Sequence, residues 1–301
     1  MNTLFVMEKW CDGNPQMGLT NNFHNLIGTF QNCVSSNIAI AHLDECARTG
    51  NDINKIIPQA VSQLNIDTVI VSHLGQSPIN PSVECLNSLP DHARLIVIWP
   101  DIGYTWADDR MRSLSNALHV SWAGETPTKG VRKFISLWTP EDEKLYFPTI
   151  QSLDISFIGS MRQERIEYLR FLLNNNIKVN ISGGQREHKL TAEQYAQLIR
   201  ESKINLNFPG SPIGEDQFKG RCLETIASKS LLLERKNSTT TKYLTPGVHY
   251  IEFDNPNDLM EKIKYYLNND KEREIIATSG YEKFNQSYSA KLFWQKVLEN
   301  V

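Results

Sequence analysis

The sequence predicts an α/β protein built from two successive doubly wound units, each with a parallel sheet. Short apolar runs alternate with amphipathic helical patterns along the whole chain, which is typical of parallel sheets covered by helices. The pattern restarts in the second half, and 301 residues are enough for two domains with separate cores. Two units in tandem are therefore the simplest arrangement.

The first half contains five apolar runs of strand length. Between them lie helical patterns, for example over 53–64 and 107–116, whose apolar residues recur at helical spacing. The expected strands are Thr3 to Met7, Ile38 to His42, Thr68 to Ser72, Leu95 to Trp99 and Leu118 to Trp122.

The second half repeats this alternation. Its expected helices cover 163–174, 192–202, 220–229 and 256–268. The expected strands are Ile155 to Ile158, Lys178 to Ile181, Ile204 to Phe208, Leu231 to Glu234 and Tyr250 to Phe253.

A hinge is expected in the stretch 138–148, where Pro140 and Pro148 bracket a charged segment between the two patterns. The tail from Lys271 to Val301 has a helical pattern, and its large apolar groups need a surface to cover them. These features predict a first domain over residues 1–138, a second over 139–288, and a C-terminal helix over 289–301 that packs back on the first domain. The apolar groups of that helix are Leu292, Phe293, Trp294, Val297 and Leu298.

Composition excludes several classes of protein. A formal net charge of −3, without a run of Lys or Arg, argues against a general nucleic-acid or membrane-surface binder. No uncharged stretch approaches the roughly 18 residues that a membrane span needs. Because the charged residues Glu8 and Lys9 follow only a short apolar run, we expect no signal peptide. The five cysteines are scattered and form no CxxC pair, so neither a disulfide framework nor a zinc site is indicated. We expect a cytoplasmic protein with no transmembrane segment and no metal site.

The most informative segment is 217–224, which leads through a helical pattern into the apolar run at Leu231. It places Lys219, Arg221 and Glu224 around the start of a helix. Backbone N–H groups at a helix N-terminus, together with Lys and Arg, hold a phosphate well. A carboxylate one turn later can accept hydrogen bonds from the two ribose hydroxyls. The segment therefore favours a nucleotide-sugar site, the alternative being an amphipathic helix with solvated charges.

Loops after other strands of the second half supply further candidates, because ligands of open α/β sheets bind outside the carboxyl ends of strands. Gly159 and Ser160 follow the first of these strands, and Arg165 lies one turn into the next helix, where it or Arg162 could pair with a phosphate. A tight turn with surface arginines explains the same residues.

Two more loops of the second half lie after strands. The loop 182–188 could fold around a nucleobase, and the loop 207–212 leads to Glu215 and Asp216, which could bind hydroxyls of a donor sugar. Solvated side chains and a flexible acidic surface loop are the competing explanations.

In the first half, Asp101 and His73 each follow an expected strand and are the candidate catalytic bases. The aromatic residues around Asp101 could stack on sugar rings, although a lone Asp or His at such a position often only caps a helix. A long, glycine-punctuated loop over 11–22 is too polar for a core and too long for an ordinary connection.

These residues carry a family resemblance. The segment Gln217 to Ser228 resembles the part of group 1 glycosyltransferases that reads lysine, small residue, arginine, any residue, phenylalanine, glutamate, and is closest to the spore-maturation-type branch. Leu223 stands where that pattern has phenylalanine, and Asp216 stands at the first position of the paired-acid pattern E-x7-E. The resemblance spans about residues 150 to 290, through the further segments Asp154 to Ser160, Ser202 to Phe208, Tyr243 to Phe253 and Tyr265 to Glu274.

The resemblance implies the GT-B fold, in which two Rossmann-like domains face a cleft, the second holding the donor nucleotide and the first the acceptor. It also implies that Glu224 binds ribose, that Lys219 and Arg221 face the diphosphate, and that no metal or other cofactor is needed. Basic side chains and a helix terminus would then neutralise the departing diphosphate.

The leading hypothesis is a metal-independent glycosyltransferase that moves a hexosyl or pentosyl group from a nucleotide diphosphate donor to a hydroxyl acceptor, such as a glycan or polysaccharide precursor. The reaction could be inverting, with Asp101 or His73 as base, or retaining without a dedicated base. A nucleotide-sugar 2-epimerase on the same fold and a non-enzymatic two-domain binding protein are the alternatives. An epimerase would convert a nucleotide sugar without any acceptor.

Overall fold

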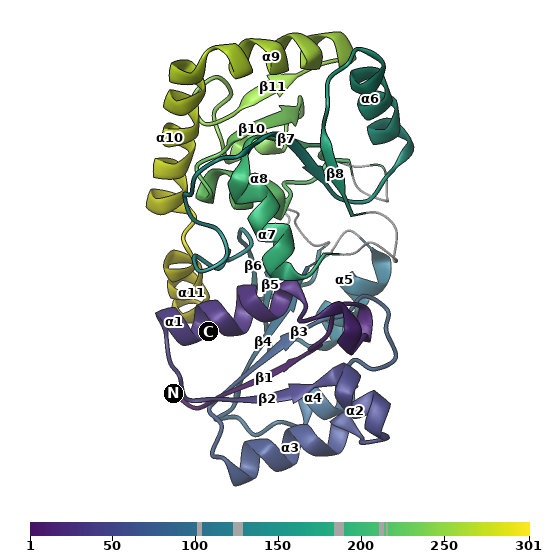
Figure 1. Ribbon diagram of the computed structural model, residues 1–301. Coiled ribbons are helices and arrows are strands. Elements are labelled where there is room, and N and C mark those ends of the chain that lie inside the picture. The colour runs from purple at the N-terminus through teal and green to yellow at the C-terminus, as the bar shows by residue number, and fades with distance from the viewer. Residues whose placement is uncertain (101–103, 123–128, 184–189, 211–213, 215) are drawn as a thin grey trace. The chain divides into compact units, whose positions relative to one another are not determined.

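The computed structural model describes residues 1–301 except 101–103, 123–128, 184–189, 211–213 and 215 (Figure 1). The described chain forms two compact units. The first comprises Met1–Pro140 with Ala290–Val301, and the second comprises Glu141–Ser289.

The first unit contains a six-stranded parallel sheet in the order β2-β1-β3-β4-β5-β6. Its strands are β1 (Thr3–Met7), β2 (Ile38–His42), β3 (Thr68–Ser72), β4 (Arg94–Trp99), β5 (Leu118–Ser121) and β6 (Phe134–Ser136). Its helices are α1 (Thr29–Cys33), α2 (Leu43–Thr49), α3 (Ile53–Gln63), α4 (Val83–Asn87), α5 (Thr105–Ser113) and α11 (Ala290–Glu299).

Helices cover both faces of this sheet, as Figure 1 shows for α1 and α2. On one face, Leu4 and Val6 of β1 join a core with residues of α2, α3, α4 and α5. On the other face, Phe5 packs edge-to-face against Phe30 of α1 and Trp294 of α11. The chain reaches α1 through a π-helical segment, Phe23–Gly28.

The C-terminal helix α11 thus belongs to the first unit. The Trp294 indole N–H donates a hydrogen bond of 2.8 Å to Oγ1 of Thr29, and both residues are buried. The expected helical tail is divided into two helices, because α10 (Asp270–Ser287) ends at Tyr288 in the second unit.

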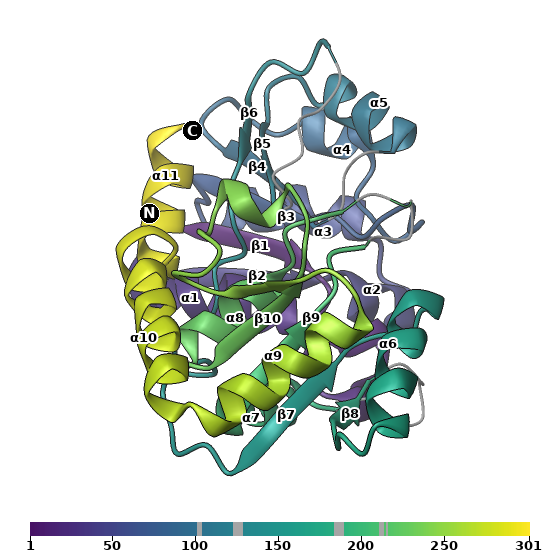
Figure 2. The ribbon, with the colours of Figure 1, turned by 90° about the horizontal axis from the view of Figure 1, so that it is seen from above.

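The second unit contains a five-stranded parallel sheet in the order β11-β10-β9-β7-β8 (Figure 2). Its strands are β7 (Leu153–Ile158), β8 (Asn180–Ser182), β9 (Ser202–Asn207), β10 (Leu231–Arg235) and β11 (Ile251–Phe253). Its helices are α6 (Gln163–Asn174), α7 (Ala192–Glu201), α8 (Gly220–Ala227), α9 (Pro256–Asn268) and α10.

Local signals explain where several helices begin. Thr191 and Gln194 form a reciprocal capping box at the start of α7. Asn255 caps α9 by accepting hydrogen bonds from two backbone N–H groups, and Pro256 occupies the first helical position. Such caps satisfy N–H groups that have no partner within the helix.

The structure shows further features that the sequence did not predict. Strand β6 was not expected, since its three residues are too few to give a periodic signal. The loop 11–22 is not wholly irregular: it contains the short 3₁₀ turns Cys11–Gly13 and Pro15–Met17, and Trp10 forms an antiparallel bridge with Leu19.

Candidate functional site

The carboxyl ends of β7 and β9 bring the main candidates of the second unit together near the N-terminus of α8. Gly159 follows β7, Asn207 ends β9, and Arg221 lies in the first turn of α8. In parallel sheets this edge is where ligands bind.

Gly159 is needed because the Arg221 guanidinium passes directly over it. A Cβ atom at position 159 would lie 2.7 Å from Nη2 of Arg221, closer than any ordinary contact. Gly183 packs against Gly159 in turn: its φ is +81°, and a Cβ atom at position 183 would lie only 3.1 Å from the Gly159 nitrogen. The two glycines therefore let the backbone and Arg221 approach each other closely.

Arg221 and Arg165 both lie over the Phe157 ring, with guanidinium carbons 5.7 and 5.9 Å from its centroid. Burial lowers the pKa of Arg165 to about 10, and the positive charges of Arg221 and Arg162 add to this effect. Three guanidinium groups thus repel one another at this edge, and an anion bound among them would relieve that repulsion.

The Arg165 side chain joins the loop after β7 to the loop after β9 by hydrogen bonds. Its Nη1 donates to the backbone oxygen and hydroxyl of Ser160, at 2.9 and 3.0 Å. Its Nη2 donates to the carbonyl oxygens of Phe208 and Gly210, at 3.2 and 3.4 Å, and Arg162 also donates to Gly210. Because its terminal N–H groups have protein partners, Arg165 fixes the loops after β7 and β9, and its direct contact with a ligand stays a prediction.

Lys219 occupies the N-cap position of α8 and has no side-chain capping bond to the helix. Its ammonium group donates to the side-chain oxygen of Gln217. The helix is buried over Cys222–Ala227, so it is not a surface helix with solvated charges. Lys219 and the first turn of α8 together give this site a positive electrostatic character.

Glu224 lies one turn after Arg221 and is 7% exposed. Its Oε2 accepts a hydrogen bond of 2.6 Å from the Tyr195 hydroxyl, and the buried Tyr146 hydroxyl also donates to the carboxylate. Burial raises the pKa of Glu224, while these hydrogen bonds and the Arg221 charge oppose the rise. The carboxylate thus has two tyrosine partners in the protein, and its contact with ribose stays a prediction.

Behind Arg221, a buried hydrogen-bond chain runs to Glu234 on β10. Nη1 of Arg221 donates to Asn207 at 2.6 Å, and the Asn207 amide donates to Oε2 of Glu234 at 2.7 Å. Burial raises the pKa of Glu234 to about 7, although hydrogen bonds from Asn207 and Cys222 favour its charged form. This chain holds Arg221 in place over Gly159.

Asp216 is engaged by the protein as well. Its Oδ1 accepts a hydrogen bond of 2.9 Å from Arg235, which also forms an ion pair of 2.6 Å with Glu164. A contact between Asp216 and a sugar would have to compete with Arg235. Glu215 lies outside the described residues.

In the first unit, His73 follows β3 and is 4% exposed. Its ring stacks on Trp99 with 4.4 Å between centroids, and on Trp106 at 5.9 Å. Burial, followed by the charge of Arg110, lowers the pKa of His73 to about 3. An imidazole with so low a pKa is a poor acceptor for a hydroxyl proton. Asp101, the other candidate base, lies outside the described residues.

Sequence reasoning missed Tyr146, Tyr195 and Glu234. Tyr195 belongs to an ordinary amphipathic pattern and Tyr146 to the expected hinge, so neither gave a separate signal. Glu234 could have been recognised from the sequence, because it is a carboxylate at the end of an apolar run that becomes an interior strand of the sheet.

Within the described ranges, no three His, Cys, Asp or Glu side chains are grouped so that they could hold a metal ion. The described helices include none that is both long enough and apolar enough to cross a bilayer.

Comparisons with known proteins place the fold. Residues 162–299 match the family model described as glycosyl transferase-like. No curated protein matches the sequence.

Three solved structures illustrate the similarity. HepE from Anabaena, solved in complex with UDP, aligns with a TM-score of 0.63 at 10% identity and covers 99% of each chain. Sucrose-phosphate synthase from Thermosynechococcus elongatus aligns with a TM-score of 0.62 at 8% identity, and the alignment covers 99% of this chain and 98% of that chain. A glycosyltransferase from Rickettsia africae aligns with a TM-score of 0.62 at 12% identity, and the alignment covers 99% of this chain and 97% of that chain. The expected GT-B fold is therefore confirmed, and the match to the glycosyl transferase-like family model covers most of the second unit together with α11.

Proposed function

We propose that this protein is a glycosyltransferase that takes a sugar from a nucleotide diphosphate donor bound to the second unit. One observation carries the proposal: Arg162, Arg165 and Arg221 converge at the N-terminus of α8, within the region that matches the glycosyl transferase-like family. A diphosphate bound there would add hydrogen-bond acceptors and negative charge to those that Glu164 and Glu224 already supply.

In this proposal, Lys219 and Arg221 stabilise the charge that grows on the diphosphate as the glycosidic bond breaks. Stabilisation that increases toward the transition state raises turnover. Glu224 would accept hydrogen bonds from ribose, and Arg165 would hold the two loops around the nucleotide. Because these cations can neutralise the leaving group, we propose that transfer needs no metal ion.

A UDP-sugar is the first donor to test, because HepE has been solved with UDP, with UDP and glucose, and with UDP-glucose. A thermal-shift series with UDP, GDP, ADP, CMP and TDP would identify the nucleotide, since a ligand that binds the folded protein raises its melting temperature. We expect one diphosphate to stabilise the protein by several degrees. No shift with any of them at millimolar concentration would contradict the proposal.

The reaction is then tested with the corresponding nucleotide sugars and a panel of glycan acceptors. Product that forms only when acceptor is present supports transfer, whereas conversion of the donor alone would favour an epimerase. Activity should survive EDTA. Full loss in EDTA, restored by Mg²⁺ or Mn²⁺, would overturn the metal-independent mechanism.

A further inference from the structure

The Tyr195 hydroxyl contacts two residues of α8 that we assign to the donor. It donates a hydrogen bond of 2.6 Å to Oε2 of Glu224, and it also hydrogen-bonds the Arg221 guanidinium. A guanidinium can only donate, so the hydroxyl oxygen accepts from Arg221 and its single hydrogen is left for Glu224. Arg221 thus sets the direction in which Tyr195 donates.

The Tyr195 side chain starts from a fixed point of the backbone. The capping box of Thr191 and Gln194 closes the N-terminus of α7 just before Tyr195, whose own N–H donates to the Thr191 carbonyl oxygen at 2.9 Å. The same helix packs against α8. The Tyr195 ring therefore reaches Glu224 from a turn that is held both by its cap and by its neighbouring helix.

Hydrogen bonds from two tyrosines use about half of the acceptor capacity of Glu224. A carboxylate has about four lone-pair sites, and Tyr195 and Tyr146 each donate to this one. About two sites remain, which is the number that the two vicinal hydroxyls of a ribose need. Tyr195 therefore leaves acceptor capacity for ribose while it fixes the orientation of the carboxylate.

Tyr195 also favours the charged form of Glu224. Burial raises the pKa of Glu224, and the hydrogen bond from Tyr195 is the largest influence that opposes this rise, ahead of the Arg221 charge and Tyr146. A protonated carboxyl group accepts fewer hydrogen bonds than a carboxylate does. Removing the Tyr195 hydroxyl should thus loosen Glu224 and weaken it as an acceptor.

We propose that Tyr195 is a positioning residue of the donor site, whose hydroxyl orients Glu224 so that the protein distinguishes a ribonucleotide from a 2′-deoxyribonucleotide. The inference deepens the proposed function and rests on it, because Glu224 is assigned to ribose there. It adds a residue of α7 to a site otherwise formed by α8 and the loops after β7 and β9.

Isothermal titration calorimetry of the full chain with UDP and with 2′-deoxy-UDP tests this role. The wild type should bind UDP more tightly, and Tyr195→Phe, which removes only the hydroxyl, should reduce this preference about three- to tenfold. In a Glu224→Gln background the same substitution should change the preference less than about twofold, because most of the preference is lost with the carboxylate. Where the thermal-shift series favours another diphosphate, that nucleotide and its 2′-deoxy form are the probes.

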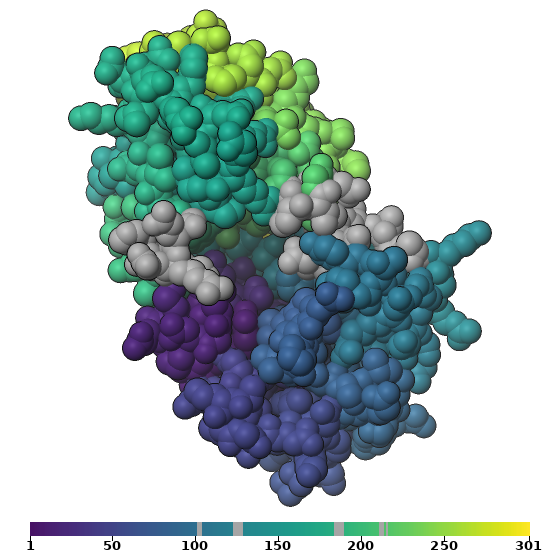
Figure 3. Space-filling view, turned by 90° about the vertical axis from the view of Figure 1, so that its right-hand side faces the viewer, coloured from purple at the N-terminus to yellow at the C-terminus, as the bar shows by residue number. Residues whose placement is uncertain are grey.

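Tyr168→Phe is the matched control. Tyr168 is another half-buried tyrosine of the second unit, and its hydroxyl donates a hydrogen bond of 3.0 Å to the carbonyl oxygen of Asp254. It lies on α6, and Figure 3 shows the side of the second unit that carries this helix. Tyr168→Phe should leave the preference for UDP unchanged.

Thermal unfolding checks that each variant is folded. If Tyr195→Phe is unfolded, Tyr146→Phe takes its place with the same expected loss, since it removes the other tyrosine donor to the same carboxylate. The inference is overturned if the wild type shows no preference for UDP, if the folded variant keeps the wild-type preference, or if the loss is as large in the Glu224→Gln background. In each of these outcomes the protein still binds a nucleoside diphosphate. Absence of any diphosphate binding by the wild type would instead contradict the proposed function, and the inference with it.

Discussion

The Asn207 side chain accepts a hydrogen bond from Arg221 at 2.6 Å, and this contact joins the last residue of β9 to the first turn of α8. Asn207 is fully buried and also donates to Glu234, so its amide cannot rotate without breaking both bonds. The hydrogen bond to Asn207, the last residue of β9, therefore fixes the orientation of Arg221 over Gly159. A guanidinium held in this way loses little conformational freedom when it binds an anion.

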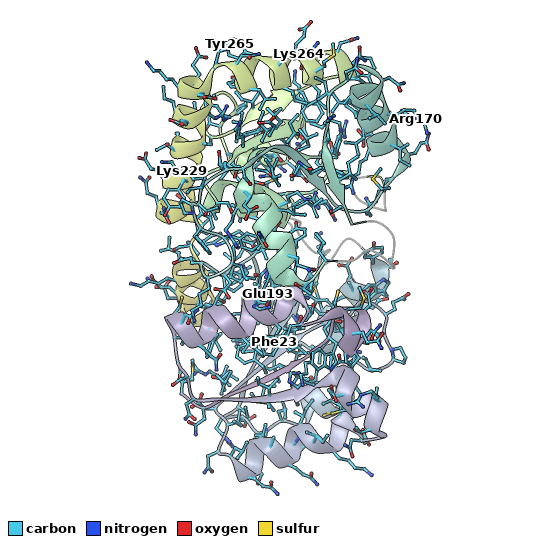
Figure 4. The ribbon with its side chains drawn as sticks, viewed as in Figure 1. Phe23, Arg170, Glu193, Lys229, Lys264 and Tyr265 are labelled. Carbon is cyan, nitrogen blue, oxygen red and sulfur yellow. The ribbon has the colours of Figure 1, made fainter. Side chains whose placement is uncertain are left out.

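Substituting the two cations should weaken diphosphate binding. Losing a charge-assisted hydrogen bond costs about 1.5–3 kcal/mol, so Lys219→Ala and Arg221→Ala should each lower UDP affinity roughly ten- to a hundredfold. The affinity for UMP, which lacks the second phosphate, should fall less in these variants than the affinity for UDP. Isothermal titration calorimetry measures both, with Arg170→Ala on the exposed face of α6 as control (Figure 4). Wild-type affinity and turnover in both variants would remove these residues from the site.

Glu234 should make stability depend on pH. Its pKa is about 7 in the folded protein against an ordinary value of 4.5, so the folded state binds more protons than the unfolded state between these values. Stability should therefore fall as pH rises from about 4.5 to 7 and level off above it, by on the order of 3 kcal/mol. Glu234→Gln should remove this contribution, and urea unfolding of both proteins across pH 4.5–8 measures it. The prediction is wrong if the free energies of unfolding of the wild type and of Glu234→Gln change with pH in the same way.

Glu224 requires a careful choice of substitution. Alanine would leave the hydroxyls of the partly buried Tyr195 and the buried Tyr146 without their acceptor, at about 1–3 kcal/mol each, so Glu224→Ala should destabilise the second unit. Glu224→Gln keeps a side-chain oxygen for one tyrosine. We expect it to fold and to bind UDP several-fold more weakly, because an amide accepts fewer ribose hydrogen bonds than a carboxylate does. Unchanged UDP affinity in a folded Glu224→Gln protein would exclude Glu224 from the ribose site.

The sequence predicted the fold better than the site. Apolar runs such as Thr3–Met7 and Thr68–Ser72 became strands with the expected bounds, because buried parallel strands are apolar on both faces. Strand β6 was not predicted, because its three residues are too few to show an alternation of apolar and polar residues. The sequence pointed to Arg165 and to Asp216, although Asp216 stands where the E-x7-E pattern has glutamate, but no pattern could reveal that Arg165 binds carbonyl groups or that Asp216 pairs with Arg235. Such contacts depend on loops brought together by the sheet.

The last prediction concerns α11. Trp294 is fully buried, packs edge-to-face on Phe30 with 4.9 Å between centroids, and donates to Thr29. Trp294→Ala should therefore destabilise the first unit by about 3–5 kcal/mol, through lost burial and the cavity left behind. Thr29→Val should cost about 1–3 kcal/mol, because it leaves the indole N–H unpaired in the core.

Gln295→Ala, on the exposed side of the same helix, is the control and should change stability by less than about 0.5 kcal/mol. Ending the chain at Ser289 removes all of α11 and should unfold the first unit and abolish transfer. The second unit has its own sheet and core, so it should still bind UDP. Thermal unfolding and UDP titration of the four proteins separate these effects. Full transfer activity and unchanged melting in the shortened protein would show that α11 is not part of the core of the first unit.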